Sequence, residues 1–284
     1  MPLKVAPLQR VSFYFSAHED DWQLFMNPSA FRDVRDGVKT VFIHVTAGDG
    51  GLGTGNGGRK HPYYLAREQG TENATRFMAD AGEYPAPAEP EAEQAVFNGH
   101  AIRRVGYRNT VAYFLRLPDG SPEGAGYAET GYQSLKRLAD GAIATLTAID
   151  DTAAYQGWRD LVATVRAIID FERGPAASVD LHVPELDPVL NPNDHPDHVM
   201  TGKLALAAAQ QLSGIRLVHH LGYASGERPE NLGGYERDMK CAVYAVTLAA
   251  IQALGHATNW PHYDQSFVAR DYCRAGNGSA LAGE

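Results

Sequence analysis

A histidine and three consecutive acids follow directly after an aromatic, apolar run. In "VSFYFSAHEDD", residues 11–17 precede His18, Glu19, Asp20 and Asp21. Burying this much like charge at the end of a core strand costs free energy unless a positive group lies among the carboxylates. The stretch therefore predicts a positive group at the end of the first strand.

A second polar stretch, "NDHPDH", covers residues 193–198 and leads into a predicted helix. His195 and His198 are three positions apart, so they face the same way once the chain turns helically. Two histidines and the carboxylates of two strand-end loops form a nitrogen and oxygen environment that suits Zn²⁺ or Fe²⁺. We therefore expect the positive group beside the acids of the first motif to be a metal ion.

A metal ion with such ligands suits the hydrolysis of an amide. Hydrolytic zinc keeps three protein ligands and one open position, where a water acquires a pKa near 7 and a carbonyl group is polarised. The attack also needs a carboxylate that takes a proton, and the departing amine needs a proton donor such as histidine. The two motifs contain both kinds of side chain.

Short apolar runs alternate with helix-length segments along the chain. This order predicts the α/β class, with a Rossmann-like three-layer fold in which helices flank a mostly parallel sheet. Both motifs follow predicted strands, and such sheets bind ligands at the carboxyl ends of their strands. The expected strands are 10–17, 38–47, 178–185 and 215–224, and the expected helices are 64–80, 131–149, 157–172, 196–213 and 234–254.

Length and charge limit the class of partner. With 284 residues, 44% of them hydrophobic, the chain can bury a large core. We expect one domain, 1–284, with a middle region around 81–130 whose sequence gives no clear structural pattern. A formal charge of −9 argues against a basic surface for nucleic acid or anionic lipid. A small molecule is the expected partner, without a membrane, and the sequence allows a homo-oligomer.

Two further features favour a cytoplasmic protein. The opening residues lack a secretory signal, and no stretch of about 18 apolar residues occurs. Cys241 and Cys273 lie far apart and outside any CxxC spacing, which suggests neither a disulfide framework nor a thiolate metal site. We expect a reducing compartment.

The combination of "AHEDD" (17–21) with "HPDH" (195–198) resembles the PIG-L, or LmbE-like, deacetylases, whose usual first motif reads AHPDDE. These enzymes depend on zinc and remove acetyl groups from N-acetylglucosaminyl conjugates. "VFIHVTAGDGG" (41–51) is similar to the second strand and glycine-rich loop of the family. The resemblance covers about two-thirds of the chain and implies a hydrolase that acts on an N-acetylated amino sugar or a related conjugate.

The resemblance also implies roles for individual residues. Asp20 would be the general base, His195 the general acid or the group that stabilises the oxyanion, and Asp197 a partner that orients a histidine. The zinc ligands would be His18, Asp21 and His198.

Two positions depart from the family's pattern. Glu19 replaces a proline that stiffens the turn, and its charge would either face solvent or compete as a ligand. Trp22 replaces a glutamate and offers an aromatic surface for stacking on a sugar ring. Arg67 is a candidate for contacting substrate hydroxyl groups, and His182 lies near a strand end on the proposed active face. These departures leave the substrate open.

Two other functions remain as alternatives. A 2-His-1-carboxylate iron oxygenase would also use an HxD motif with a distant histidine, although that chemistry usually belongs to an antiparallel jelly roll. A family member that has lost catalysis would be a metal-stabilised binding module. Elsewhere, "GTGNGG" (53–58) is not followed directly by a helix and does not predict nucleotide binding. Of His219 and His220, we expect one in the core and one exposed.

Overall fold

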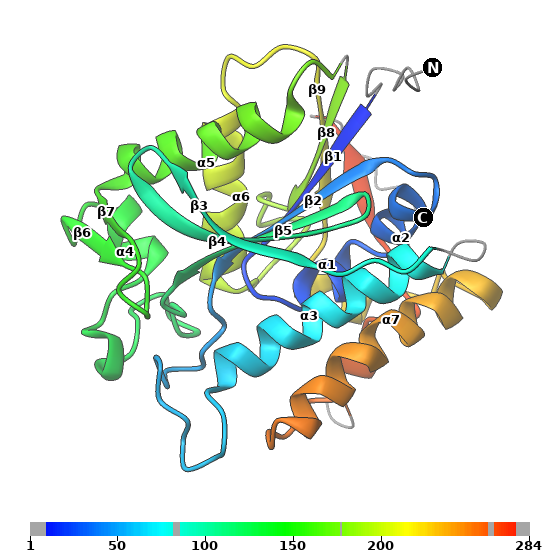
Figure 1. Ribbon diagram of the computed structural model, residues 1–284, viewed down its shortest axis with the longest axis horizontal. Helices are drawn as coiled ribbons and strands as arrows, with labels where there is room; N and C mark the ends of the chain where they lie inside the picture. The colour runs from blue at the N-terminus through cyan, green and yellow to red at the C-terminus, as the bar shows by residue number, and fades with distance from the viewer. Residues whose placement is uncertain (1–9, 82–85, 177, 261–263, 277–284) are drawn as a thin grey trace.

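The computed structural model describes residues 10–81, 86–176, 178–260 and 264–276. An eight-stranded sheet in the order β10-β9-β8-β1-β2-β5-β4-β3 forms its centre (Figure 1). Within this order, β9, β8, β1, β2 and β5 run parallel to one another. β10 pairs antiparallel with β9, β4 with β5, and β3 with β4. The strands are β1 (Arg10–Ser16), β2 (Lys39–Thr46), β3 (Glu91–Phe97), β4 (His100–Tyr107), β5 (Thr110–Leu117), β8 (Ser178–Pro184), β9 (Ile215–His220) and β10 (Cys273–Ala275).

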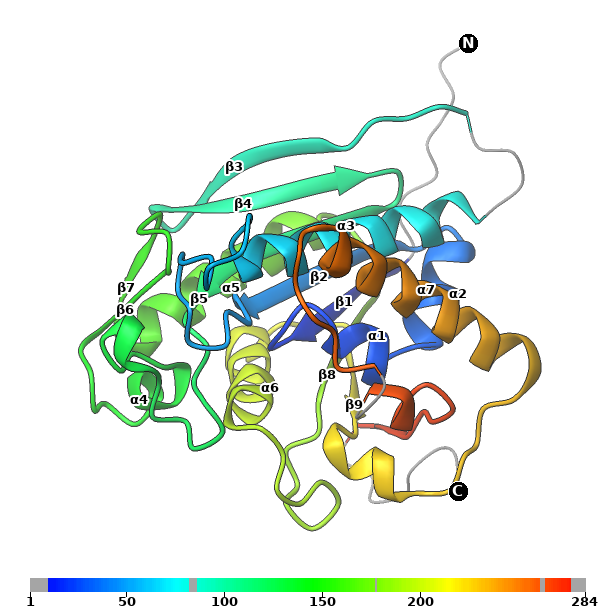
Figure 2. The same cartoon turned by 90° about the horizontal axis from the view of Figure 1, so that it is seen from below.

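Helices cover both faces of this sheet, so the expected three-layer α/β fold is confirmed. Both views show α3 and α7 side by side on one face (Figures 1 and 2). That face also carries α1 and α2, and the other carries α4, α5 and α6. The helices are α1 (Asp21–Phe25), α2 (Ser29–Arg35), α3 (Tyr63–Asp80), α4 (Leu135–Ala139), α5 (Trp158–Arg173), α6 (Pro196–Ala209) and α7 (Gly234–Ala253).

Alternation along the central strands explains the two apolar cores. In β1, Val11, Phe13 and Phe15 belong to the core under α5 and α6, whereas Tyr14 belongs to the core under α1, α3 and α7. Successive side chains of a strand point to opposite faces of the sheet. Since both faces are covered, the strand reads as a nearly continuous apolar run. This burial fixes β1 at the centre, with both motifs close to its carboxyl end.

Two sequence-based expectations about secondary structure are wrong. The helix expected over 131–149 is replaced by α4 and by a small hairpin of β6 (Thr145–Thr147) and β7 (Ala154–Gln156). Gly141, with φ of 71°, lies directly after α4, and a positive φ does not continue a right-handed helix. The strand expected over 215–224 ends at His220, where a short 3₁₀ helix, Tyr223–Glu227, follows.

The middle region 81–130 supplies an extension of the sheet. β3 and β4 form a hairpin, and β4 pairs with β5, which returns to the parallel part beside β2. β5 therefore runs in the same direction as β1, and the residues after it reach the same edge of the sheet as the first motif. None of the helices in the described ranges is long and apolar enough to span a membrane.

Candidate metal centre

The first motif forms a tight turn between β1 and α1. The backbone N–H of His18 donates to the Asp21 carboxylate at 2.8 Å, and His18 Nδ1 lies 3.6 Å from Asp21 Oδ1. Both side chains are buried. The turn therefore presents one imidazole and one carboxylate together at the carboxyl end of the central strand.

The second motif meets this turn from the start of α6. Pro196 occupies the first turn of that helix, where a missing N–H costs nothing. In the same turn, His198 Nε2 lies 3.2 Å from Asp21 Oδ1. Ligand atoms of His18, Asp21 and His198 all lie within 4.8 Å of one another. The structure thus brings together the three residues that the sequence suggested as metal ligands.

A second group of acids faces the other nitrogen of His18. His18 Nε2 lies 3.6 Å from Asp197 Oδ2 and 3.9 Å from Asp119 Oδ2. Ligand atoms of His18, Asp119, His195 and Asp197 also lie within 4.8 Å of one another. Asp197 Oδ2 accepts a hydrogen bond from the backbone N–H of Gly120 at 2.7 Å, which ties the start of α6 to the loop after β5.

The electrostatics of the site favour positive charge. Burial opposes protonation of His18 and His198, but the carboxylates outweigh it. Asp21 and Asp197 hold the pKa of His18 well above its usual range, and Asp194 and Asp21 raise the pKa of His198 to about 10. The pKa of Asp21 lies well below its usual range despite burial, because both histidines face it. A cation among these groups would replace the protons that the histidines hold here.

The residues fit a divalent transition metal. Two imidazoles and one carboxylate are a common three-ligand set for zinc and leave a fourth position open. Among the described residues, Nε2 of His18 and Nε2 of His198 are buried and have no hydrogen-bond partner. His198 Nδ1 lies 2.8 Å from Asp194 Oδ1, so the ring donates there, and a cation that replaces the proton on Nε2 would meet the lone pair of that nitrogen beside Asp21. The same donors also suit iron.

Arg67 on α3 balances the other two acids of the first motif. Its Nε lies 2.9 Å from Glu19 Oε2, and its Nη2 lies 2.5 Å from Asp20 Oδ1. Glu19 is 1% exposed, so it neither faces solvent nor joins the cluster of ligands around Asp21. Asp20 remains at the wall of the cavity with its orientation fixed by the guanidinium group. The positive group that the acids require is therefore partly Arg67.

His195 points a nitrogen–hydrogen bond toward the cavity. Its Nδ1 accepts the backbone N–H of Asp197 at 3.2 Å, so the proton of a neutral ring is on Nε2. Burial and the neighbouring His18 lower the pKa of His195. A neutral ring with its donor facing the cavity suits hydrogen bonding to an oxygen that gains negative charge.

Two candidate side chains, Trp22 and His182, lie away from the cavity. Trp22 is completely buried and donates its indole N–H to Thr71 at 2.9 Å, so it presents no surface for stacking on a sugar. His182 is buried on β8 and lies 2.9 Å from His220. The expectation that one of His219 and His220 is exposed is wrong, because both are buried.

Sequence reasoning missed two acids of the site. Asp119 follows β5, and Asp194 lies one helical turn before His198. The signal for Asp194 is its spacing of four from a ligand histidine, in the same stretch that supplied the motif. The signal for Asp119 is its position two residues after an apolar run, "VAYFLRL", whose place in the sheet the sequence alone did not reveal.

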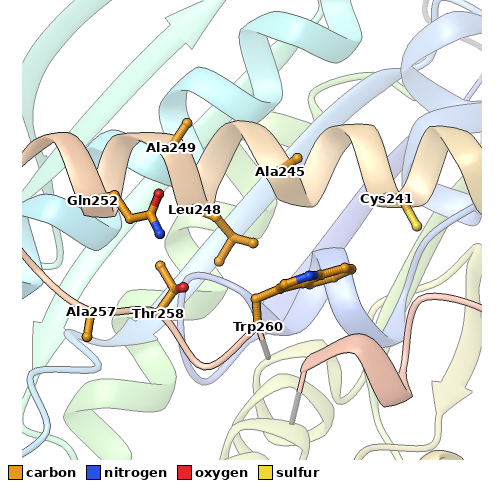
Figure 3. Close-up of a pocket in the computed structure, with 8 residues that line it drawn as sticks. All are labelled: Cys241, Ala245, Leu248, Ala249, Gln252, Ala257, Thr258 and Trp260. Carbon is orange, nitrogen blue, oxygen red and sulfur yellow. The ribbon is translucent and has the colours of Figure 1, made fainter. Parts of the chain in front are cut away.

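Two cavities differ in their chemistry. The cavity at the motifs has a volume of about 150 Å³, and its wall includes His18, Asp20, Arg67, Asp119 and His195. A larger hollow of about 730 Å³ lies on the outer side of α7. Figure 3 shows that it is lined by Cys241, Ala245, Leu248, Ala249, Gln252, Ala257, Thr258 and Trp260. Among the described residues, the lining of the larger hollow includes no acid or histidine, so the smaller cavity is the candidate active site.

Comparisons with known proteins give weak similarities. No family model and no curated protein matches the chain. An N,N'-diacetylchitobiose deacetylase from Pyrococcus horikoshii is 15% identical, with a TM-score of 0.47 over 89% of this chain and 73% of that chain. A deacetylase of the A40926 pseudoaglycone is 17% identical, with a TM-score of 0.44 over 87% and 83%.

A hydratase is similar at almost the same level. The 4-carboxy-2-hydroxymuconate hydratase from Pseudomonas putida is 13% identical, with a TM-score of 0.41 over 91% of this chain and 82% of that chain. Because these weak similarities include enzymes of different activities, the function of this chain has to follow from its own side chains.

Proposed function

We propose that this chain is a metal-dependent amide hydrolase of the PIG-L, or LmbE-like, kind, which removes an acetyl group from an N-acetylated amino sugar or a related small conjugate. One observation carries the proposal. Two motifs far apart in sequence place His18, Asp21 and His198 around one point, with Asp20 and His195 at the wall of the same cavity. This is the set of groups that amide hydrolysis requires.

The ligand set would hold Zn²⁺ or Fe²⁺. Such an ion supplies Lewis acidity, which polarises an amide carbonyl and makes a water acidic. A carboxylate binds a metal ion in its ionised form, and the lowered pKa of Asp21 favours this form. Asp194 holds the ring of His198 so that Nε2 faces Asp21.

Asp20 would move the protons, and His195 would stabilise the developing charge. Asp20 would accept the proton of the attacking water, with Arg67 keeping its carboxylate at the cavity wall. His195, neutral with its proton on Nε2, would donate a hydrogen bond to the developing oxyanion, and Asp20 would pass the proton taken from the water to the departing amine. With about 150 Å³, the cavity admits the acetamido group and leaves the rest of a conjugate at the mouth.

The fold and the position of Asp20 weigh against an iron oxygenase. The sheet is mostly parallel and covered by helices, not an antiparallel jelly roll. A facial triad would use His18, Asp20 and His198, but Asp20 pairs with Arg67 and is not in the ligand cluster. The carboxylate that faces both histidines is that of Asp21.

The test combines metal content with acetate release. The wild type, His198→Ala and the control His100→Ala are purified without added metal, loaded with zinc and analysed by elemental analysis. His100 pairs with Asp160 outside the cluster. We expect His198→Ala to lose one metal ion per chain and His100→Ala to lose none. A wild type that binds no metal at these residues would overturn the proposal.

Activity is then tested with N-acetylglucosamine and N,N'-diacetylchitobiose as probes. We expect Asp20→Asn to keep its metal and to release acetate about 10²- to 10⁴-fold more slowly than the wild type. Equal rates for the two proteins would refute the role of Asp20. A wild type that binds metal and sugar but releases no acetate from any N-acetyl sugar would favour the metal-stabilised binding module instead.

A further inference from the structure

A second cluster of metal-type ligands lies where β9 ends. β10 pairs antiparallel with β9, and Cys273 lies opposite His220. His220 Nδ1 lies 3.8 Å from Asp271 Oδ1, and ligand atoms of His220, Asp271 and Cys273 lie within 4.8 Å of one another. None of the three lines the catalytic cavity. The cluster is therefore separate from the candidate metal centre.

His182 fixes the protonation of this cluster through a chain of two histidines. His182 Nδ1 lies 2.9 Å from His220 Nε2, so one of these nitrogens donates and the other accepts. At the far end, His182 Nε2 lies 3.9 Å from Asp33 Oδ2. The two imidazoles thus connect a carboxylate at one end, Asp33, with a carboxylate at the other, Asp271.

The two carboxylates differ in what else they contact. Asp33 accepts from Arg10 at 2.5 Å and from Tyr14 at 2.8 Å, so it does not depend on His182 for a partner. If His182 keeps its proton on Nε2, then His220 donates to His182 and turns the lone pair of Nδ1 toward Asp271. In this arrangement His220 Nδ1 and the carboxylate of Asp271 face each other as two acceptors.

Unpartnered atoms lie at both ends of this chain of histidines. Among the described residues, His182 Nε2 at the Asp33 end has no hydrogen-bond partner, and neither has His220 Nδ1 or Asp271 Oδ1 at the other end. The side chain of His220 is completely buried and that of Asp271 is 11% exposed. Nearby cations are engaged with other groups. Arg216 is bidentate to Asp180, and Lys240 donates to a backbone carbonyl. A cation bound between the ring and the carboxylate would contact both unpartnered atoms.

The thiol distinguishes a metal ion from a proton. We propose that His220 Nδ1, a carboxylate oxygen of Asp271 and Cys273 Sγ bind a divalent transition metal, with zinc as the best match and water as the fourth ligand. Tetrahedral zinc places such ligand atoms roughly 3.4–3.6 Å apart. The 3.8 Å between His220 Nδ1 and Asp271 Oδ1 therefore needs a contraction of a few tenths of an ångström, and the pairs that include Cys273 Sγ, which lie within 4.8 Å, need at most about 1.4 Å. On binding, Cys273 loses its thiol proton to solvent.

This ion would have a structural role. β10 has only three residues and lies at an edge of the sheet, so few backbone hydrogen bonds hold it. A metal shared between β9 and β10 would fasten the two strands. His182 would position the ring of His220, as hydrogen-bond partners of ligand histidines generally do. The metal would therefore stabilise the fold without taking part in catalysis.

Cobalt is the probe that reports on this site alone. Thiolate ligation of Co²⁺ gives a near-ultraviolet charge-transfer band, and the proposed catalytic ligands contain no sulfur. The metal-free wild type is titrated with Co²⁺ alongside Cys273→Ala and the matched control Cys241→Ala, whose thiol lies at the hollow beside α7 (Figure 3). With Co²⁺ in excess, we expect a band whose final intensity corresponds to one thiolate-bound Co²⁺ per chain in the wild type and in Cys241→Ala, and no band in Cys273→Ala.

His182→Leu tests the positioning role in a chain that keeps all three ligands. We expect the charge-transfer band to remain and the affinity for Co²⁺ at this site to fall about 10- to 100-fold. Circular dichroism checks that each variant is folded. The absence of a band in the folded wild type, or its survival in Cys273→Ala, would overturn the proposal and leave a proton as the shared charge.

Zinc analysis separates this proposal from the catalytic one. If both sites exist, the wild type holds two zinc ions per chain, and His198→Ala and Cys273→Ala hold one each. A wild type with one zinc that Cys273→Ala loses and His198→Ala retains would support the second site and refute the catalytic centre. One zinc that only His198→Ala loses would do the reverse.

Discussion

Replacing Asp194 by asparagine should weaken metal binding although Asp194 touches no metal. Its Oδ1 accepts the Nδ1–H of His198 at 2.8 Å, and its Oδ2 accepts from Asn191 at 2.7 Å. The side chain is 1% exposed, so little solvent screens its charge. Asparagine keeps the size and one acceptor but removes the charge that makes the imidazole a stronger ligand.

The expected loss is about 10- to 100-fold in zinc affinity, or about 1.4 to 2.7 kcal/mol. The loss should grow between pH 7 and pH 9. In the metal-free protein Asp194 also raises the pKa of His198 to about 10, so at lower pH a proton competes with the metal more strongly in the wild type than in the variant. Removing the carboxylate relieves that competition and hides part of the loss at pH 7.

Competition with a fluorescent chelator measures the affinity at both pH values. Asp170→Asn is the control, since it removes one charge from an exposed position on α5. The control should bind zinc as the wild type does. A change of less than twofold in folded Asp194→Asn at pH 9, or a loss that is larger at pH 7, would refute the reasoning.

Three further variants test burial and charge around the cavity. Trp22→Phe should lower the free energy of unfolding by about 1–3 kcal/mol and leave KM for any substrate within twofold, because the indole is buried. A large rise in KM would indicate instead that Trp22 contacts the substrate. Burial raises the pKa of Asp264 to about 6, so its contribution should lower wild-type stability as pH rises from about 4 to about 6. In denaturant unfolding at pH 7, Asp264→Asn should be more stable than the wild type by up to about 3 kcal/mol. Equal pH profiles of the two proteins would contradict this. Gly120→Ala would bring a Cβ within 2.4 Å of Asp197 Oδ1, so we expect a lower Tm and slower acetate release, and an unchanged enzyme would show that Asp197 tolerates displacement.

The sequence predicts the part of the site that depends on parallel strands. β1 and β8 are long apolar runs buried on both faces, and their carboxyl ends must meet at one edge. The motifs and the predicted strand ends therefore placed the two groups of histidines and carboxylates near one another, and the choice of His18, Asp21 and His198 came from the resemblance to the deacetylases. Their roles as ligands stay a prediction until the metal is measured.

The parts that the sequence did not reveal depend on pairing between distant segments. Asp119 reaches the cavity because β5 lies beside β2, a pairing that the pattern of residues 81–130 does not indicate. Over 131–149, apolar residues recur at helical spacing, but Gly141 with its positive φ ends the helix, and the later residues pair as a hairpin. The sequence did not reveal that Trp22 is buried, because this burial depends on packing against α3, where Thr71 accepts the indole hydrogen bond. Trp22 was therefore expected to be available for a ligand.

The central position of β1 also bears on synthesis of the chain. β1 pairs with β2 on one side and with β8 on the other. A nascent chain that has emerged as far as α5 already holds His18 and Asp21 but lacks β8 and His198. Because a ligand stabilises only the state that binds it, zinc can stabilise the folded chain only after α6 has left the ribosome. The proposed enzyme would therefore acquire its ion late in translation, and the ion would fasten the last parallel strands to the first.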